Sequence, residues 1–337
     1  MDVGFLLFFI FYSLFTLYIC RTNNLIIDYK LEKHKRFSSK LKSNSIGGIL
    51  LASFLFYQFF YLTIDYNLLI FLSFILFIGF MSDIKKLNNV GLRFFLQLIL
   101  IIFFVTILEF KIETTKIDFF DQILTNNFFN IFFVTFCLMV LMNGANFIDG
   151  LNGLLIKYFL LIYLIIFFAF PDFQGVNKYF LINIILILSI ILILNLLGFI
   201  YMGDSGAYLL SLFTGIYLIN FSSNNVFVSP YLIIIFLWYP CFELLFSMIR
   251  RVKKKLKAYK PDVLHLHQYI YIFIKNKFNI TNDLFAHLIA SLSINFYNLI
   301  VFILSINYIY NSTYLIFILL INIFLYLLIY KFLKKIK

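Results

Sequence analysis

Runs of about 20 apolar residues recur along almost the whole chain, and each is long enough to cross the hydrocarbon core of a bilayer. Of the 337 residues, 63% are hydrophobic and only 12% are charged, with a mean hydropathy of +1.00. A soluble domain has about one-quarter charged residues, so this chain has too little polar surface to stay in water. The sequence therefore predicts a polytopic membrane protein before any motif is considered.

The apolar runs predict an all-α transmembrane helical bundle of about eleven helices (ten or eleven). No soluble domain, long linker or strand pattern separates them, so residues 1–337 are expected to form a single integral membrane domain. The first run follows no basic residue and precedes no small-residue cleavage site, which favours a retained helix over a signal peptide. The expected helices are 3–20, 46–64, 67–82, 92–110, 128–143, 153–170, 178–197, 205–221, 226–248, 285–307 and 313–333.

The basic residues predict the orientation of the bundle. The chain has 27 Lys and Arg residues, and all except Lys111, Lys116 and Lys178 lie in or beside the loops after helices 1, 3, 5, 7 and 9 or in the tail. By the positive-inside rule these loops and the C-terminus are cytoplasmic, and the N-terminus is outside. The net charge of +12 then reflects topology and suits anionic lipids and substrates. A nucleic-acid partner is not expected, because no soluble basic face exists.

The informative polar residues gather at the predicted cytoplasmic ends of the helices. A charged carboxylate near the membrane core costs about 2.5–3.5 kcal/mol on insertion scales, so such groups should be few and functional. Their convergence on one face predicts a binding or catalytic site there. They are Asp28, Asp83, Asn143, Asn146, Asp149, Asp204, His265 and His267.

The segment NGANFIDGLNGL (143–154) is the most specific of these. Asn143, Asn146 and Asp149 recur every three residues at a predicted helix end, so their side chains can point in one broad direction. The glycines that follow allow a tight turn or a close approach of the backbone to a ligand. Amides suit base or sugar recognition, and a carboxylate suits a metal or hydroxyl contact. A polar helix end followed by a glycine turn remains the alternative interpretation.

The segment MGDSGAYLL (202–210) places Asp204 between glycines where the eighth predicted helix begins. An aspartate there can be a helix N-cap. It can also be a magnesium ligand, because Mg²⁺ bound to phosphates prefers hard oxygen donors. The backbone N–H groups of a helix start can in addition face anionic oxygens.

The segment KPDVLHLHQ (260–268) contains two of the four histidines, His265 and His267. A zinc site would need further Cys or His ligands nearby, and none is present in the sequence around them. We therefore expect these histidines to contact phosphate or sugar. The preceding run RRVKKKLK (250–257) is typical of a membrane-surface anchor that also attracts anionic substrates.

Together and in this order, these segments resemble the polyprenyl-phosphate N-acetylhexosamine-1-phosphate transferases, glycosyltransferase family 4. The resemblance extends over nearly the whole chain and includes Gly47-Gly48, GFMSDIKKL (79–87) and Asn195 ahead of MGDSGA. The His-Leu-His-Gln sequence from His265 resembles the WecA-like branch more than the muramyl-pentapeptide (MraY) branch, whose members carry a triple-His run.

The resemblance implies an enzyme that transfers N-acetylhexosamine-1-phosphate from a UDP-sugar, UDP-GlcNAc or a relative, to undecaprenyl phosphate and releases UMP. The product would begin a surface glycan such as O-antigen, teichoic acid or cell wall, at the cytoplasmic face of the bacterial cytoplasmic membrane. A muramyl-pentapeptide-type phosphotransferase is the alternative within the family. A transporter of lipid-linked substrates is the alternative from another class, but transporters place their acids near the membrane midplane, often between inverted repeats, and no repeat is seen here.

The resemblance also implies the roles of the site residues. Asp83, Asp149 and Asp204 would be catalytic, and Asp204 with Asp83 would bind Mg²⁺, with Mn²⁺ as an alternative. A homodimer and contact with membrane lipid are compatible with the family. The expected substrate-binding residues are Asn143, Asn146, Asn152, Asn195, His265, His267 and Lys33, the last in the basic first loop.

Four positions depart from the family pattern. Ser82 replaces the first acid of the usual aspartate pair, and Asn152 replaces the second acid of the Asp-Gly-x-Asp-Gly pattern. An Arg that is common before the histidines is Val263, and the last His is Gln268. Without the first acid, direct attack by the lipid phosphate is favoured over a covalent aspartyl intermediate, because a phosphomonoester with a second pKa near 6 is mostly dianionic at neutral pH.

Overall fold

The computed structural model describes residues 3–26, 44–62, 65–255 and 264–336, and within these ranges the chain forms α-helices, turns and one isolated β-bridge. The all-α prediction is thus confirmed. The helices are α1 (Val3–Thr22), α2 (Gly47–Leu62), α3 (Tyr66–Asp83), α4 (Val90–Ile107), α5 (Asp118–Leu124), α6 (Asn127–Ile148), α7 (Leu154–Ala169), α8 (Lys178–Leu196), α9 (Gly203–Asn224), α10 (Pro230–Lys253), α11 (Leu266–Lys277), α12 (Asp283–Ile306) and α13 (Ser312–Ile336).

Each of the eleven predicted helices has a counterpart, with ends that differ by up to five residues. Nine of the described helices are long and apolar enough to span a membrane by length and composition, and α2 and α7 contain shorter apolar segments. Many large apolar side chains are exposed on the outside of this bundle, as expected for helices in contact with lipid. The helical membrane bundle is therefore the observed fold.

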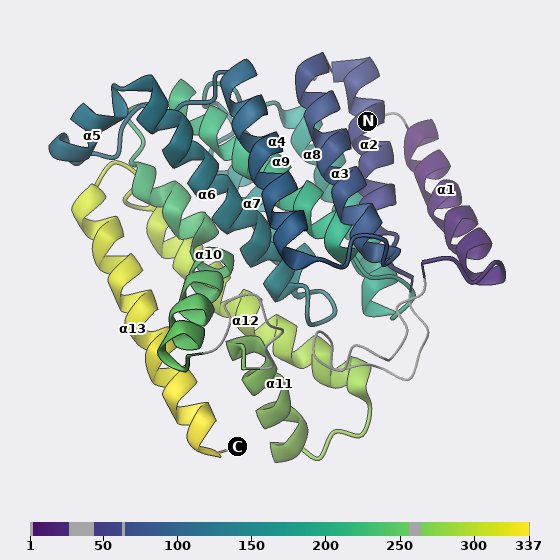
Figure 1. The fold of residues 1–337 in the computed structure, drawn as a ribbon. Helices are drawn as coiled ribbons and strands as arrows, with labels where there is room; N and C mark the ends of the chain where they lie inside the picture. The colour runs from purple at the N-terminus through teal and green to yellow at the C-terminus, as the bar shows by residue number, and fades with distance from the viewer. Residues whose placement is uncertain (1–2, 27–43, 63–64, 256–263, 337) are drawn as a thin grey trace.

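Two short helices, α5 and α11, were not predicted. α5 has only seven residues, and α11 has twelve with Lys275 and Lys277 in its last turn. Neither contains an apolar run long enough to signal a span. α5 packs against α6, and α11 packs against α12 and α13 (Figure 1).

Helix α9 lies inside the bundle and packs against α2, α3 and α6 (Figure 1). Small residues make this possible, because they let helix backbones come close in a membrane. A Cβ atom added to Gly79 of α3 would lie 2.4 Å from the Cα atom of Ser205, and one added to Gly48 of α2 would lie 2.6 Å from the backbone nitrogen of Gly206. The start of α9 is thus enclosed by glycines from two other helices.

Described residues that flank the loops expected on one face meet at one end of the bundle. Asn44, at the end of the first loop, pairs with Ile200 in an isolated bridge, and the backbone N–H of Gly47 donates to the carbonyl of Tyr201 at 3.0 Å. At the opposite end, Lys116 Nζ donates to the carbonyl of Val226 at 3.2 Å. The first contact places the beginning of α2 beside the MGDSGA segment, where the candidate site lies.

Candidate functional site

The carboxylate of Asp83, the last residue of α3, caps the start of α9. Its Oδ1 accepts a hydrogen bond from the backbone N–H of Asp204 at 2.8 Å. Its Oδ2 accepts from the backbone N–H of Ser205 at 3.1 Å and from the Ser205 hydroxyl at 2.6 Å. Gly203 has a φ of 74°, and a Cβ atom there would lie 2.7 Å from the Asp83 carboxylate. Only glycine fits this turn, which brings the two carboxylates together.

Asp204 lies in the first turn of α9, where its side chain meets α3 and α4. Its Oδ2 accepts from the Ser82 hydroxyl at 2.6 Å and forms an ion pair with Arg93 Nη1 at 2.5 Å. Arg93 also donates to the Ser82 hydroxyl. The Arg93 and Asp204 side chains are 13% and 11% exposed, so the pair is mostly shielded from water and its Coulomb attraction is stronger than on an open surface.

The predicted helix end at Asn143 was wrong by five residues, because α6 continues to Ile148 with Asp149 as its C-cap. Asn143 Nδ2 donates to the carbonyl of Met139 in its own helix at 2.9 Å. Asn146 Nδ2 donates to the Tyr208 hydroxyl of α9 at 2.9 Å. Since Tyr208 follows Asp204 by one helical turn, Asn146 joins the polar end of α6 to the carboxylate pair.

The glycine turn after Asp149 is held by buried amides. Asn152 Nδ2 donates to the carbonyl of Asn195 at 2.8 Å, and Asn152 Oδ1 lies 3.1 Å from His287 Nδ1. Asn195 Oδ1 accepts from the backbone N–H of Gly153 at 2.5 Å, and its Nδ2 donates to the carbonyl of Ile200. Both amides are almost fully buried and bind protein groups. They fix the α6–α7 turn against the loop before α9, and their contact with substrate remains a prediction.

The histidine segment folds onto the same end of the bundle. His265 precedes α11, and its Nδ1 lies 2.9 Å from Oε1 of Glu243, a buried residue of α10. The imidazoles of His265 and His267 stack at 5.4 Å, and the His265 ring meets the edge of Phe147 from α6 at 5.1 Å. Burial lowers the pKa of His267 to about 3, so this ring is neutral at physiological pH.

The start of α11 shows what the substitution at Gln268 does. Gln268 Oε1 accepts from the backbone N–H of His265 at 3.2 Å, which is the reciprocal half of a capping box. Neither ring nitrogen of His267 has a hydrogen-bond partner among the residues that the structure describes. In the described structure, His265 is thus bound to an acid, and His267 is buried with a ring contact to His265 but with no hydrogen bond to a described residue.

Comparison with known families matches part of this architecture. Residues 66–222 match glycosyl transferase family 4. No curated protein matches the chain. The matched segment extends from α3 into the last turn of α9 and contains Asp83, Arg93, Asp149 and Asp204. The match supports the family resemblance and indicates that the protein is a transferase. It also supports the transfer of a sugar phosphate to a polyprenyl phosphate as the kind of function. The histidine loop lies beyond the matched residues.

Arg93, Tyr208 and Glu243 belong to this site geometry and were not singled out from the sequence. Arg93 and Glu243 are ionisable residues inside runs that otherwise read as transmembrane helices, and such residues are expensive in lipid. That cost was the signal that would have identified them. Lys33 and Asp28, by contrast, were predicted from the basic first loop and lie outside the described residues.

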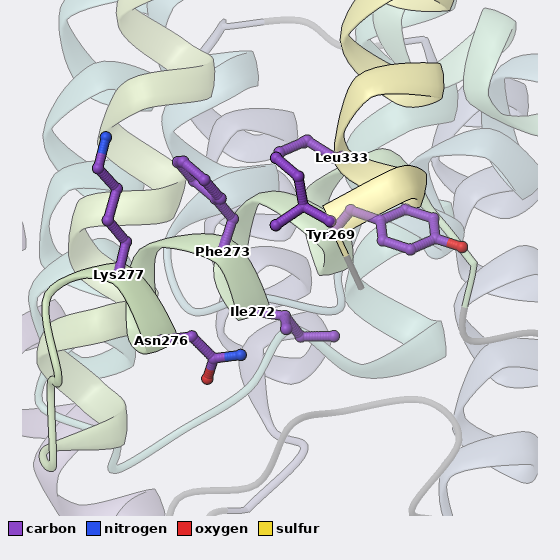
Figure 2. Close-up of a pocket in the computed structure, with 7 residues that line it drawn as sticks. Tyr269, Ile272, Phe273, Asn276, Lys277 and Leu333 are labelled. Atoms are coloured by element: carbon purple, nitrogen blue, oxygen red, sulfur yellow. The ribbon is translucent and has the colours of Figure 1, made fainter.

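A pocket of about 360 Å³ lies between α11 and α13 (Figure 2). None of the predicted site residues lines it, although α11 also carries His267. Its walls are mostly apolar and aromatic, and they comprise Tyr269, Ile272, Phe273, Asn276, Lys277, Leu333 and Ile336.

The carboxylates of Asp83 and Asp204 can be compared with the ligands that the expected Mg²⁺ requires. No group of three or more Cys, His, Asp or Glu residues suited to a metal occurs among the described residues. Mg²⁺ does not need one, because it usually binds one or two carboxylates together with substrate phosphates and water. Asp83 and Asp204 supply two adjacent carboxylates, so the donor set fits Mg²⁺. Arg93 is a competing cation on Asp204 Oδ2.

Proposed function

We propose that this protein transfers an N-acetylhexosamine-1-phosphate from a UDP-sugar to undecaprenyl phosphate and releases UMP. The observation that carries the proposal is the meeting of Asp83 and Asp204, which are 121 positions apart, at the end of the bundle where α6 and the histidine loop also present polar side chains. The family 4 match supports the reaction type. We further propose that this end faces the cytoplasm of a bacterial cell, since the sequence predicts that the loops rich in Lys and Arg lie on this side.

The proposed step is a direct displacement at phosphorus. An oxygen of the lipid phosphate forms a bond to the β-phosphorus of the donor, and the bond from that phosphorus to the bridging oxygen breaks. UMP leaves with the bridging oxygen, and the sugar stays on the β-phosphate. Ser82 donates to Asp204 and takes the place of the acid that a covalent route would use first. The dianionic lipid phosphate needs little help from a base at neutral pH.

The chain's own residues have distinct roles in this step. Asp83 and Asp204 would hold Mg²⁺, which neutralises charge on the diphosphate when bound. Asp83 keeps the first turn of α9 in place, and Arg93 holds Asp204 in one orientation. Asn146 and Asp149 would bind the donor, and His265 would contact its sugar or phosphate.

The donor defines the branch of the family. The His-Leu-His-Gln sequence favours a WecA-like enzyme, for which UDP-GlcNAc or a related UDP-N-acetylhexosamine is the donor. A panel of UDP-sugars that includes a UDP-muramyl-pentapeptide, tested on the purified protein in detergent, separates the two branches by the donor that yields UMP.

The decisive assay measures UMP release from purified protein with a UDP-sugar, undecaprenyl phosphate and Mg²⁺. Asp204→Asn should abolish release while the protein stays folded in detergent, because the amide cannot replace a carboxylate at the metal. Full activity in that variant removes the metal role of Asp204. A covalent adduct trapped on Asp83 rejects direct attack, and movement of intact lipid-linked sugar without UMP release favours a transporter.

A further inference from the structure

Glu243 is a fully buried carboxylate in the apolar helix α10. Such a group is costly in a membrane protein unless it has a function or close partners. Both of its oxygens are engaged, because Oε1 lies 2.9 Å from His265 Nδ1 and Oε2 accepts from the Tyr326 hydroxyl of α13 at 2.7 Å. The carboxylate therefore joins the histidine loop to the last helix of the chain.

The contact defines which nitrogen of His265 carries a proton. A carboxylate accepts hydrogen bonds and donates none, so the nitrogen that faces it must be Nδ1–H. The Ser247 hydroxyl lies 3.2 Å from the same nitrogen. A neutral His265 then has its lone pair on Nε2, which accepts from a hydroxyl, and a protonated His265 has Nε2–H, which donates to a phosphate oxygen.

The surrounding residues fix the orientation of the His265 ring as well as its tautomer. His265 stacks on His267 and meets the edge of Phe147, the residue after Asn146 in α6. The contact with Glu243 on one side thus holds the imidazole beside the polar end of α6 on the other. Carboxylate groups behind a functional histidine commonly fix its orientation in this way.

We propose that Glu243 is a positioning residue, which keeps His265 in the Nδ1–H tautomer so that Nε2 can bind the sugar-phosphate donor. Tyr326 holds the other oxygen of the carboxylate in place. The inference rests on the proposed function for the identity of the ligand, but the tautomer is a property of the protein alone. Glu243, His265 and Tyr326 all lie outside the segment that matches family 4.

The first test reads the tautomer without any substrate. The full-length protein is labelled with ¹⁵N-histidine, and His265 is assigned in detergent from the signal that His265→Ala removes. We expect Nδ1–H in the wild type at neutral pH. In Glu243→Met, which keeps the length but loses the acceptor, the Nε2–H form should appear. An unchanged His265 signal in Glu243→Met overturns the inference.

The second test uses the donor and a double-mutant cycle. Removal of a carboxylate that orients a metal-binding histidine typically costs about 10–100-fold in affinity or activity, and by analogy we expect a loss of that order in kcat/KM for Glu243→Met. In the His265→Ala background the same substitution should cause no further loss. An equal loss in both backgrounds would mean that Glu243 acts only through the packing of α10.

The matched control is Asn298→Leu. Asn298 Oδ1 accepts from Trp238 Nε1 of α10 at 2.9 Å, so this variant also removes a buried polar contact of the same helix. It should leave the His265 tautomer unchanged. If wild-type protein releases no UMP, the proposed function fails, and the ¹⁵N measurement still decides the role of Glu243.

Discussion

The close approach of α3 and α9 at Gly79 can be tested by adding a single methyl group. A Cβ atom at Gly79 would lie 2.4 Å from the Ser205 Cα atom and 2.6 Å from its backbone nitrogen. Carbon atoms in contact are normally about 3.5–4.0 Å apart, so the two helices would have to separate by about 1 Å. The atoms that clash are backbone, which a rotamer change cannot move.

The expected cost follows from two opposing terms. Overpacking of this kind destabilises by about 1–3 kcal/mol. Displacement of Asp83, one turn after Gly79, would also weaken the cap on α9, which is worth about 1 kcal/mol. Alanine returns up to about 1 kcal/mol through its higher helix propensity. Gly79→Ala should therefore be about 1–3 kcal/mol less stable than the wild type.

Gly91→Ala is the matched control, because Gly91 is also helical and a Cβ atom there lies 3.4 Å from its nearest neighbour, Asn89 Oδ1. This variant should be as stable as the wild type or slightly more. Denaturant titration in detergent micelles measures both, and UMP release measures whether the carboxylate pair has moved. If Gly79→Ala matches Gly91→Ala in stability and in activity, the backbone contact between α3 and α9 is not as described.

Three further outcomes are expected. Between pH 7.5 and pH 5 His267 becomes protonated in the unfolded chain, where its pKa is about 6.5, but not in the folded protein, where its pKa is about 3. The free energy of unfolding should therefore fall as the pH falls, by about 2 kcal/mol from this residue. Thermal unfolding of His267→Gln should show a smaller fall over the same pH range. Arg93→Ala should reduce UMP release at least tenfold, because Asp204 loses the ion pair that orients it, and should lower the Mg²⁺ concentration needed for half-maximal rate, because the competing cation is gone; an unchanged metal titration would show that Arg93 does not act on Asp204. Tyr208→Phe, which removes the acceptor of Asn146, should raise the KM for the donor with little change in folding, and an unaltered KM would remove the link between α6 and α9.

Periodicity and hydropathy were sufficient to predict the membrane helices, because a run of about 20 apolar residues is typical of a helix that spans a bilayer. They were also sufficient to place Asp83, Asp204 and His265 at one end of the bundle. They were not sufficient to predict which side chains bind one another across helices. Asp204 was expected as a possible N-cap of its own helix, whereas the cap is the carboxylate of Asp83 from another helix.

The missed contacts have a common physical reason. The pairing of Arg93 with Asp204, and of Glu243 with His265, depends on how helices far apart in the sequence rotate against one another. Local propensity carries no information on that rotation. The roles predicted for Asn152 and Asn195 concern substrate, while their visible hydrogen bonds join two turns of the protein.

The central position of α9 has a consequence for the order in which the protein matures. During synthesis α2, α3 and α6 leave the ribosome before α9, yet α9 ends up enclosed by them. It is also the least hydrophobic of the nine candidate spans, so its own affinity for lipid is the weakest and its neighbours must supply the environment that retains it. Until it arrives, the Asp83 carboxylate lacks the amides that it caps. In a nascent chain Asp83 and Asp204 can therefore come together only after α9 has been translated, when insertion of the bundle is well advanced.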